Sequence, residues 1–297
     1  MILVTGCTGQ VGTSLIRRLL KEGIPPSSIR GLARNPSRTK DPNFPREIDL
    51  RQGDVADPSA VRAAMDGVHQ VFHLVGILLE SRQATFQKIH VEGTRNVVEA
   101  AKERKVSRLV MLSSLGTRPN ARSRYHQTKW QAEEHVRRSG LAWTLFRPSV
   151  IFGPLDDFTN QFAKMVSLSP VVPVPGQGKI RLQPVWVEDV VQCLYQSLND
   201  PTTHGQTLEM GGPEVLTLDE IIDRIQTKLG KTRYRMHIPF PLLTTQAWFL
   251  ERLLPRPPLT VDQMILAQED NVTRHPFPWQ RFGIAPRALR DGIAEFL

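Results

Sequence analysis

The sequence predicts an α/β fold, a doubly wound parallel sheet with a smaller C-terminal α/β lobe. Over the first half of the chain, short β-branched apolar runs alternate with segments that carry apolar residues at helical spacing, which is typical of parallel strands and their covering helices. A glycine-rich loop directly follows the first apolar run. Right-handed crossovers are expected between the strands. The strands are expected near residues 1–5, 28–34, 47–52, 69–75, 107–113 and 141–147, and the helices at 10–21, 59–65, 92–104 and 125–138.

The second half of the chain differs from the first in its proline content and in the order of its apolar runs. The segment 168–176 is too rich in proline for a central strand or a helix interior, which predicts a loop. The apolar run 182–187, followed by a helix at 188–198, is expected to return to the main sheet. Further helices are expected at 217–229, ended by Gly230, and near 286–297.

The length predicts two structural parts, because 297 residues exceed the roughly 250 that one core usually organises. The main domain is expected at 1–154 and to be completed by about 181–200. The smaller substrate or partner lobe is expected at 155–180 and 201–297.

The composition is that of a globular protein with an excess of positive charge. There are 38 basic and 29 acidic residues, a formal net charge of +9, which favours an anionic partner such as a phosphorylated cofactor, an acidic protein or membrane headgroups. Nucleic acid is unlikely as a partner because no recognition-helix or zinc-finger pattern is present. Two cysteines and no histidine cluster argue against a disulfide framework and a metal site. The absence of a signal peptide and of a long apolar run predicts a cytoplasmic protein.

A dinucleotide site is predicted where the first strand ends. Three glycines follow that strand with the spacing Gly-x-x-Gly-x-x-Gly. Such glycines permit a tight turn, close approach to a pyrophosphate and close helix packing, while the helix N-terminus offers N–H groups to the phosphates. The alternative is a merely structural turn, and the strand–helix units behind the loop favour a Rossmann-type ligand site instead. The expected contacts come from Gly6, Thr8, Gly9, Gln10, Val11 and Gly12.

The end of the second strand favours NADP(H) over NAD(H). An acidic residue at this position accepts the ribose 2′-hydroxyl of NAD(H), but the chain has Arg34 and, four residues on, Arg38. Arginine pairs well with a 2′-phosphate. The alternative is that both are solvated loop cations, and the lack of a competing carboxylate favours the phosphate.

The glycine spacing resembles that of the short-chain dehydrogenase/reductase superfamily. The resemblance implies that Asp54 and Val55, after the third strand, contact the adenine, while Asp57 is expected to cap the next helix. The residues expected to pass beneath the cofactor riboses are Leu74, Val75 and Gly76.

A Ser-Tyr-Lys group is predicted after the fifth strand. Tyr125 and Lys129 are four residues apart and so share one helix face. An ammonium ion near a phenol lowers the phenol pKa, which would let Tyr125 exchange a proton with a carbonyl or an alcohol. Ser114 is expected to hold the substrate oxygen, and Ser113 to lie on the cofactor side with Tyr125 and Lys129. A surface pair, or a pair that only clamps the cofactor, would have the same sequence.

Later segments resemble the extended and atypical branches of the superfamily. Residues 147–154 resemble the loop that flanks the nicotinamide, which implies cofactor contacts from Pro148, Ser149 and Val150. More narrowly, the chain resembles bacterial relatives of the NDUFA-nine-type accessory subunit of respiratory complex I. The segments that carry this resemblance are 90–96, 125–130, 262–263, 270–272 and 282–284.

This narrower resemblance implies NADPH held as a structural cofactor and a respiratory complex as partner. His90 stands where the extended enzymes usually carry asparagine, which departs from their proton relay. Three function classes follow: an NADP(H)-dependent oxidoreductase or epimerase-like enzyme acting on a carbonyl, an alcohol or a sugar-nucleotide-like substrate; a non-catalytic accessory or assembly protein; and an NmrA-like redox sensor. The intact Tyr125 and Lys129 pair favours the enzyme.

The segment 240–254 predicts an apolar helix edged by cations. Such a helix either covers the core or lies on an anionic membrane surface, and the second reading would place the protein at the periphery of the inner membrane. The flanking cations are Arg233, Arg235, Arg252 and Arg256.

Overall fold

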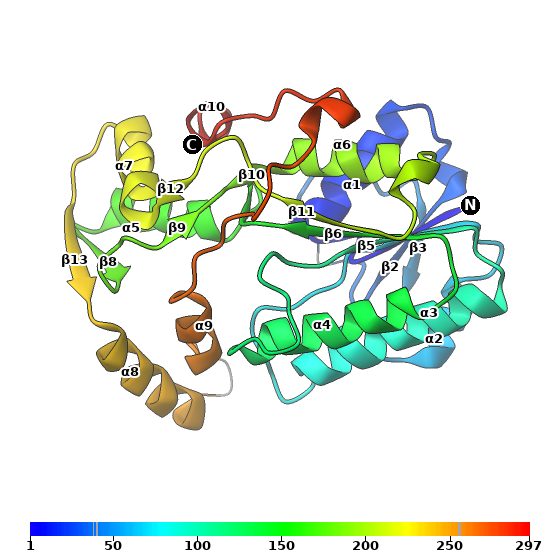
Figure 1. Ribbon diagram of the computed structural model, residues 1–297, viewed down its shortest axis with the longest axis horizontal. Helices are drawn as coiled ribbons and strands as arrows, with labels where there is room; N and C mark the ends of the chain where they lie inside the picture. Colours follow the sequence, from blue (N-terminus) through cyan, green and yellow to red (C-terminus); the bar gives the residue numbers. More distant parts are fainter. Residues whose placement is uncertain (38, 40, 255–256) are drawn as a thin grey trace. The chain divides into compact units, whose positions relative to one another are not determined.

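The computed structural model describes residues 1–37, 39, 41–254 and 257–297, which form two units (Figure 1). Unit 1 consists of Met1–Ile77, Gln83–Arg147 and Val187–Leu208, and unit 2 of Leu78–Arg82, Pro148–Trp186 and Glu209–Leu297. The predicted Arg38 and Arg256 lie outside the described residues.

Unit 1 is organised by a seven-stranded sheet with the order β11-β6-β5-β4-β1-β2-β3. The neighbours from β3 to β6 are all paired in parallel. Strands β2 and β3 are added outward from β1 on one side, and β5 and β6 outward from β4 on the other, so the order of strands reverses between β1 and β4, as in a doubly wound fold. The strands are β1 (Ile2–Thr5), β2 (Ile29–Ala33), β3 (Asp49–Gln52), β4 (Gln70–His73), β5 (Arg108–Leu112), β6 (Trp143–Pro148) and β11 (Gln206–Met210).

Helices cover both faces of this sheet. They lie in two groups, one on each face of the sheet, as Figure 1 shows. The core on the second face is built from the apolar side of each helix and the strand residues below it, all fully or nearly fully buried. The helices are α1 (Gln10–Lys21) and α6 (Val187–Ser197) on the first face, and α2 (Pro58–Ala64), α3 (Gly93–Glu103) and α4 (Arg124–Arg137) on the second.

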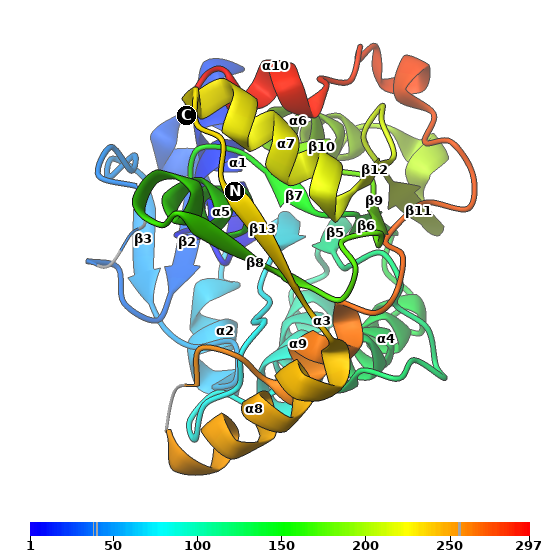
Figure 2. The ribbon, with the colours of Figure 1, turned by 90° about the vertical axis from the view of Figure 1, so that its left-hand side faces the viewer.

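Unit 2 contains three two-stranded sheets, β10-β7, β12-β9 and β13-β8, and a second hydrophobic core. Its strands are β7 (Ile151–Phe152), β8 (Val171–Pro175), β9 (Arg181–Leu182), β10 (Val185–Trp186), β12 (Leu216–Thr217) and β13 (Tyr234–Ile238). Its helices are α5 (Phe158–Leu168), α7 (Leu218–Leu229), α8 (Phe240–Leu253), α9 (Val261–Leu266) and α10 (Leu289–Ile293). Figure 2 shows β13 running beside β8 and leading into α8.

The six strands and four helices predicted for the first half are confirmed within a few residues, and so is the doubly wound parallel sheet. The Gly230 cap of α7 is also confirmed, because Gly230 adopts a left-handed conformation there.

Two predictions for the second half are wrong, and the bounds of a third differ. The proline-rich segment 168–176 contains the strand β8. This is possible because β8 pairs with a single neighbour, so Pro173, which has no N–H, does not have to hydrogen-bond to a second strand. The run 182–187 pairs with β7 and β12 in unit 2 rather than with the main sheet, which gains β11 instead. The C-terminal helix is shorter than expected, at Leu289–Ile293.

Candidate functional site

The glycine loop closes tightly on the first turn of α1. Gly6 has a φ of +73°, and the N–H of Gly9 donates to its carbonyl at 3.1 Å. A Cβ on Gly12 would lie 2.3 Å from the same carbonyl oxygen, so only glycine allows the helix to approach the loop this closely. A Cβ on Gly9, in contrast, would meet nothing nearer than 3.4 Å. Gly9 therefore keeps the loop surface bare rather than permitting the packing.

The start of α1 fits an anionic group. Gly9 caps the helix without a side-chain hydrogen bond, and the first turn carries no acidic residue. Two buried side-chain atoms, Gln10 Nε2 and Ser113 Oγ, find no hydrogen-bond partner within the described part of the chain. Buried polar groups are normally satisfied, so these atoms, with the free helix N-terminus, match the donors that a dinucleotide requires. Thr8 and Val11 are partly exposed on the same loop.

Cys7 has a structural position in this loop. Its Sγ lies 3.6 Å from the Leu32 carbonyl and packs against Gly31, where a Cβ would be 2.9 Å away. Burial raises the pKa of the Cys7 thiol to about 12. The residue therefore stays a neutral thiol and packs β2 against the loop.

The segment that follows β4 bridges the glycine loop and α4. A Cβ on Gly6 would lie 3.1 Å from the Leu74 carbonyl, and a Cβ on Gly76 would lie 3.7 Å from Lys129 Nζ. Leu74 and Val75 are half-buried and Gly76 is exposed. The structure thus brings the three predicted ribose-side residues together with the loop and with Lys129.

The predicted adenine-side residues lie between β3 and α2. Asp54 Oδ1 accepts the Ala56 N–H at 3.0 Å, and the Val55 carbonyl accepts the amide of Asn96 at 3.0 Å. Asp57 caps α2 by accepting the Ser59 N–H at 2.9 Å, which confirms that expectation. Asp54 therefore shapes a turn, and its contact with adenine stays a prediction.

Arg34 directly follows β2 and is exposed. Its carbonyl accepts a long hydrogen bond of 3.4 Å from Gln52 Nε2, at the end of the neighbouring β3. No carboxylate stands in the sequence from Arg34 to Ser37. The position is open to a phosphate, and the assignment to the 2′-phosphate stays a prediction.

Lys129 is buried on the inner side of α4. Its Nζ donates to the Leu112 carbonyl at 3.0 Å, at the end of β5. Burial lowers the pKa of Lys129 to about 8, and the charge of Glu133 opposes that shift. Lys129 is therefore an ammonium ion that exchanges its proton near neutral pH.

Tyr125 lies one turn before Lys129, and its phenol is hydrogen-bonded to the Ser114 side chain. Burial raises the pKa of Tyr125 and outweighs this hydrogen bond, which lowers it. The prediction that Lys129 lowers the Tyr125 pKa is therefore wrong, because desolvation of the phenol dominates. At neutral pH the side chain is a neutral phenol, which can donate a proton.

His90 is fixed beneath Tyr125 in a π-helical segment, Gln87–Glu92, that runs into α3. Its Nε2 accepts the Ile77 N–H at 3.1 Å, its Nδ1 lies 3.0 Å from Thr128 Oγ1, and its ring meets the Tyr125 ring edge-on. Burial lowers the pKa of His90 to about 2. The neutral ring therefore carries its proton on Nδ1 and donates it to Thr128. Because both ring nitrogens are hydrogen-bonded, His90 links the segment after β4 to α4 and is not arranged to relay a proton.

His73 forms a second buried link that sequence reasoning missed. Its Nδ1 lies 2.7 Å from Thr5 Oγ1 and its Nε2 lies 2.9 Å from Thr94 Oγ1. Burial, with a smaller effect of the Lys129 charge, lowers the pKa of His73 to about 3. A lone histidine at a strand end carries no sequence signal for this role, because its two threonine partners lie 68 and 21 residues away.

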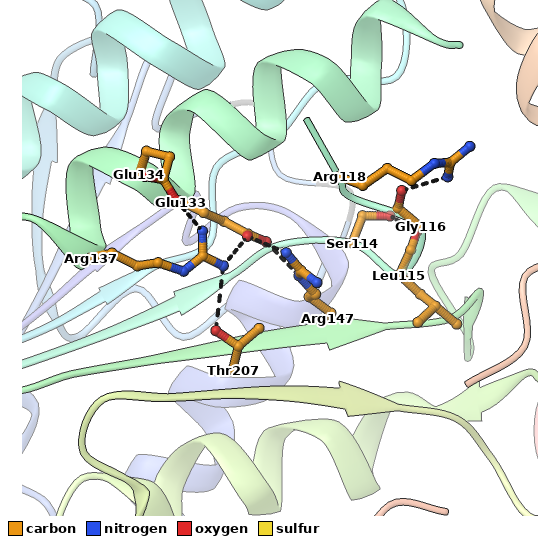
Figure 3. Close-up of polar contacts among 9 residues, drawn as sticks. All are labelled: Ser114, Leu115, Gly116, Arg118, Glu133, Glu134, Arg137, Arg147 and Thr207. Atoms are coloured by element: carbon orange, nitrogen blue, oxygen red, sulfur yellow. Dashed lines mark hydrogen bonds and ion pairs between the residues drawn. The ribbon is translucent and has the colours of Figure 1, made fainter. Parts of the chain in front are cut away.

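A buried ion cluster anchors α4 to β6 (Figure 3). The Glu133 side chain is fully buried and accepts hydrogen bonds from Arg147 Nε at 2.9 Å and Nη2 at 2.6 Å. Arg137 Nη2 reaches the same carboxylate at 2.5 Å. Both guanidinium groups also lie over the Trp130 ring, at 5.8 Å and 4.7 Å from its centroid. Sequence reasoning missed this cluster, although Glu133 follows Lys129 by four residues and so lies on the same face.

Figure 3 also shows the turn that carries Ser114 away from β5. Ser114 Oγ donates to the Leu115 carbonyl at 3.3 Å, and Arg118 Nη1 donates to the Gly116 carbonyl at 2.9 Å. Gly116 has a φ of +87°, and a Cβ there would lie 2.8 Å from the His126 ring. The turn is thereby held against α4.

Pro148 ends β6, Ser149 and Val150 follow it, and all three belong to unit 2. Ser149 N–H donates to the Met210 carbonyl at 2.8 Å, and its hydroxyl donates to Asn271, 2.6 Å from the side-chain oxygen. Their contact with the nicotinamide stays a prediction.

Unit 2 contains a cavity of about 620 Å³. None of its lining residues is a predicted cofactor contact, and it combines an apolar wall with polar side chains. The lining residues are Gly176, Gln177, Lys179, Ile180, His237, Pro239, Phe240, Pro241 and Asp270.

The described residues contain neither a cluster of metal-ligating side chains nor a helix long and apolar enough to cross a membrane.

Comparison with known proteins identifies the family. The chain is 26% identical to an Arabidopsis thaliana protein named NADH dehydrogenase (ubiquinone) 1 alpha subcomplex subunit 9, mitochondrial, over 99% of this chain and 76% of that protein. It is 29% identical to the ceramide reductase of Caulobacter vibrioides, over 82% of this chain and 75% of the reductase. The fold matches the NADPH complex of the Escherichia coli quinone oxidoreductase QOR2 with a TM-score of 0.76 at 19% identity, over 99% of both chains. The sequence model described as NAD(P)H-binding matches residues 6–201. The resemblance to complex I accessory subunits is confirmed, and the chain belongs to the NAD(P)H-binding family.

Proposed function

We propose that this protein is an NADP(H)-dependent oxidoreductase that interconverts a carbonyl group and an alcohol. The observation that carries the proposal is the grouping of Ser114, Tyr125 and Lys129 at the end of β5, beside Gly76 and the glycine loop. A binding protein needs the loop and a lysine near the ribose. It does not need a tyrosine hydroxyl paired with a serine at the same place.

The three side chains have separate roles in this proposal. The bound cofactor would supply the hydride. Ser114 and Tyr125 would both hydrogen-bond the substrate oxygen, and Tyr125 would donate its proton to that oxygen during reduction. The raised pKa of Tyr125 supports this direction, because the phenol is protonated at neutral pH. Lys129 would hold the nicotinamide ribose and, with its pKa near 8, return a proton to Tyr125.

Two features support NADP(H) as the preferred cofactor. Arg34 is exposed directly after β2, and no carboxylate competes with it for the 2′-substituent. The proposed substrate is a carbonyl, an alcohol or a sugar-nucleotide-like compound, and the name of the ceramide reductase relative supports a reductive reaction.

The second candidate function is an NADPH-holding accessory or assembly protein of a respiratory complex. Similarity to the Arabidopsis subunit over 99% of the chain favours it. In that case Tyr125 and Lys129 would only fix the cofactor, and the nucleotide would exchange slowly.

The test has two parts, the identification of any nucleotide that the purified protein retains and a measurement of its turnover. Mass spectrometry of the purified protein identifies any bound nucleotide, and NADPH oxidation is then followed with aldehydes, ketones and quinones. We expect Tyr125→Phe to lower turnover by about 10²- to 10⁴-fold while NADPH affinity changes little. Tyr234→Phe is the matched control, because Tyr234 is 73% exposed on β13. Full activity of Tyr125→Phe would contradict the proposed mechanism. A non-exchanging NADPH with no turnover would favour the accessory role.

A further inference from the structure

The helix α8 presents large apolar side chains to solvent. Leu242, Phe249 and Leu253 are 63%, 54% and 76% exposed. They recur at intervals of seven and four residues and therefore lie along one face of the helix. Trp248, 43% exposed, adjoins this stripe and meets the Phe249 ring edge-on at 4.9 Å. We call these four residues the α8 apolar face.

The orientation of α8 is fixed by its opposite side. Leu243 and Ala247 are buried and pack with Met264 of α9. Glu251 Oε1 accepts the Val261 N–H at 3.0 Å, at the start of the same helix. Figure 2 shows α8 and α9 side by side. The exposure of the apolar face therefore belongs to a packed helix and is not a consequence of fraying.

Positive charge accompanies this face. Arg252 lies over the Trp248 ring, 3.4 Å from its centroid, at the edge of the stripe. Between residues 231 and 254 the sequence holds a single acidic residue, which is Glu251.

The shape and chemistry of this face fit a lipid surface better than a protein groove. A helix that lies in a membrane interface has an apolar stripe bordered by cations and by tryptophan, whose ring sits at the level of the headgroups. The α8 apolar face has such a stripe, with Arg252 and Trp248 at its edge, and 14 residues are too few to cross a bilayer.

We propose that unit 2 docks on a bilayer with anionic headgroups through the α8 apolar face. Leu242, Phe249 and Leu253 enter the boundary between headgroups and acyl chains. Arg252, stacked on Trp248, meets the lipid phosphates.

The test is flotation of the full-length protein with vesicles of phosphatidylcholine alone and with phosphatidylglycerol added. We expect binding to the anionic vesicles, with weaker binding at high salt because the charges are then screened. Phe249→Ser/Leu253→Ser should weaken binding at least tenfold. Arg252→Gln should weaken it about fivefold, the effect of one cation near an anionic surface. Val215→Ser is the matched control, because Val215 is 47% exposed elsewhere in unit 2 and should leave binding unchanged.

Three results would overturn the proposal. The first is the absence of flotation with anionic vesicles at low salt, and the second is binding that the double variant retains. The third is a dimer, measured by light scattering, that Phe249→Ser/Leu253→Ser dissociates, since this would assign the face to a second copy of the chain. Circular dichroism of the double variant distinguishes loss of docking from loss of folding.

Discussion

Arg147 donates two hydrogen bonds to the buried carboxylate of Glu133, at 2.9 Å and 2.6 Å, and so joins the last strand of the parallel array to α4. The same helix carries Lys129 one turn and Tyr125 two turns before Glu133, on the same side. The ion pair thus determines where the proposed acid and its lysine stand relative to the end of β5.

Replacing Glu133 with glutamine should destabilise the protein strongly. The substitution removes the buried negative charge that both Arg137 and Arg147 contact, and breaking a buried pair in this way costs about 3–5 kcal/mol. Urea denaturation gives the free energy of unfolding. Glu134→Gln is the control, because Glu134 pairs with Arg137 and Arg138 at 27% exposure and should change stability by about 1 kcal/mol or less. Equal losses for the two variants would contradict this role of Glu133.

Stability should fall with acid through two histidines. The pKa of His73 is lowered to about 3 and that of His90 to about 2, so both rings are neutral in the folded protein. The unfolded chain takes up their protons below pH ~6.5. Stability is therefore complete above this pH and is lost as the pH falls, by about 1.4 kcal/mol per pH unit for each histidine. Denaturation between pH 6.5 and 5 measures the slope. His90→Asn should reduce it by about half, whereas the same change at the exposed His69 should not alter it.

The parallel sheet could be predicted from sequence because each strand is a short buried run between helix signals. Unit 2 could not be predicted as well. Its strands are two to five residues long, and pairings such as that of β8 with β13 join segments about 60 residues apart. Proline in β8 argues locally against a strand, and only the position of β8 beside a single neighbour makes the strand possible.

The candidate site was predictable where a residue type at a given spacing implies its role, as with Gly12 and the pair Tyr125 and Lys129. The direction of the Tyr125 pKa shift was not, because desolvation depends on how much protein surrounds the phenol. The hydrogen bonds of His90 to Ile77 and Thr128 could not be predicted from the sequence either, because they depend on how the chain before α3 packs against α4.

The pH dependence should differ between the two reaction directions. Reduction needs the protonated phenol of Tyr125, and because its pKa is raised, the rate should stay level from pH 6 to 8. Alcohol oxidation needs the phenolate, so its rate should rise up to tenfold per pH unit over the same range. Ser114→Ala removes the hydrogen bond that lowers the Tyr125 pKa and should move the oxidation limb to higher pH. Initial rates with NADPH and NADP⁺ measure both limbs. An unchanged pH profile for oxidation in Ser114→Ala would contradict the hydrogen bond between Ser114 and Tyr125.

Arg34→Ala should weaken binding of NADPH more than that of NADH. A charge-assisted hydrogen bond to a phosphate contributes about 1.5–3 kcal/mol, so the NADPH Kd should rise about ten- to a hundredfold while the NADH Kd changes less than about threefold. Fluorescence titration of each nucleotide gives both constants. Arg51→Ala, on the neighbouring β3, is the control, because Arg51 pairs with Asp49 and is 60% exposed. An equal loss of affinity for NADPH and NADH would contradict the assignment of Arg34 to the 2′-phosphate.

Gly9 and Gly12 should respond differently to alanine. A methyl group on Gly12 would lie 2.3 Å from the Gly6 carbonyl oxygen, so the helix must move and Gly12→Ala should lower the unfolding free energy by about 1–3 kcal/mol. Gly9 has a φ of −80°, which alanine adopts without strain, and its Cβ meets only the same oxygen, at 3.4 Å. Gly9→Ala should therefore keep its stability and lose nucleotide affinity at least tenfold, because the methyl group occupies the surface that the pyrophosphate approaches. Urea denaturation and NADPH titration of both variants separate the two effects. Unchanged NADPH affinity in a folded Gly9→Ala protein would place the phosphates elsewhere.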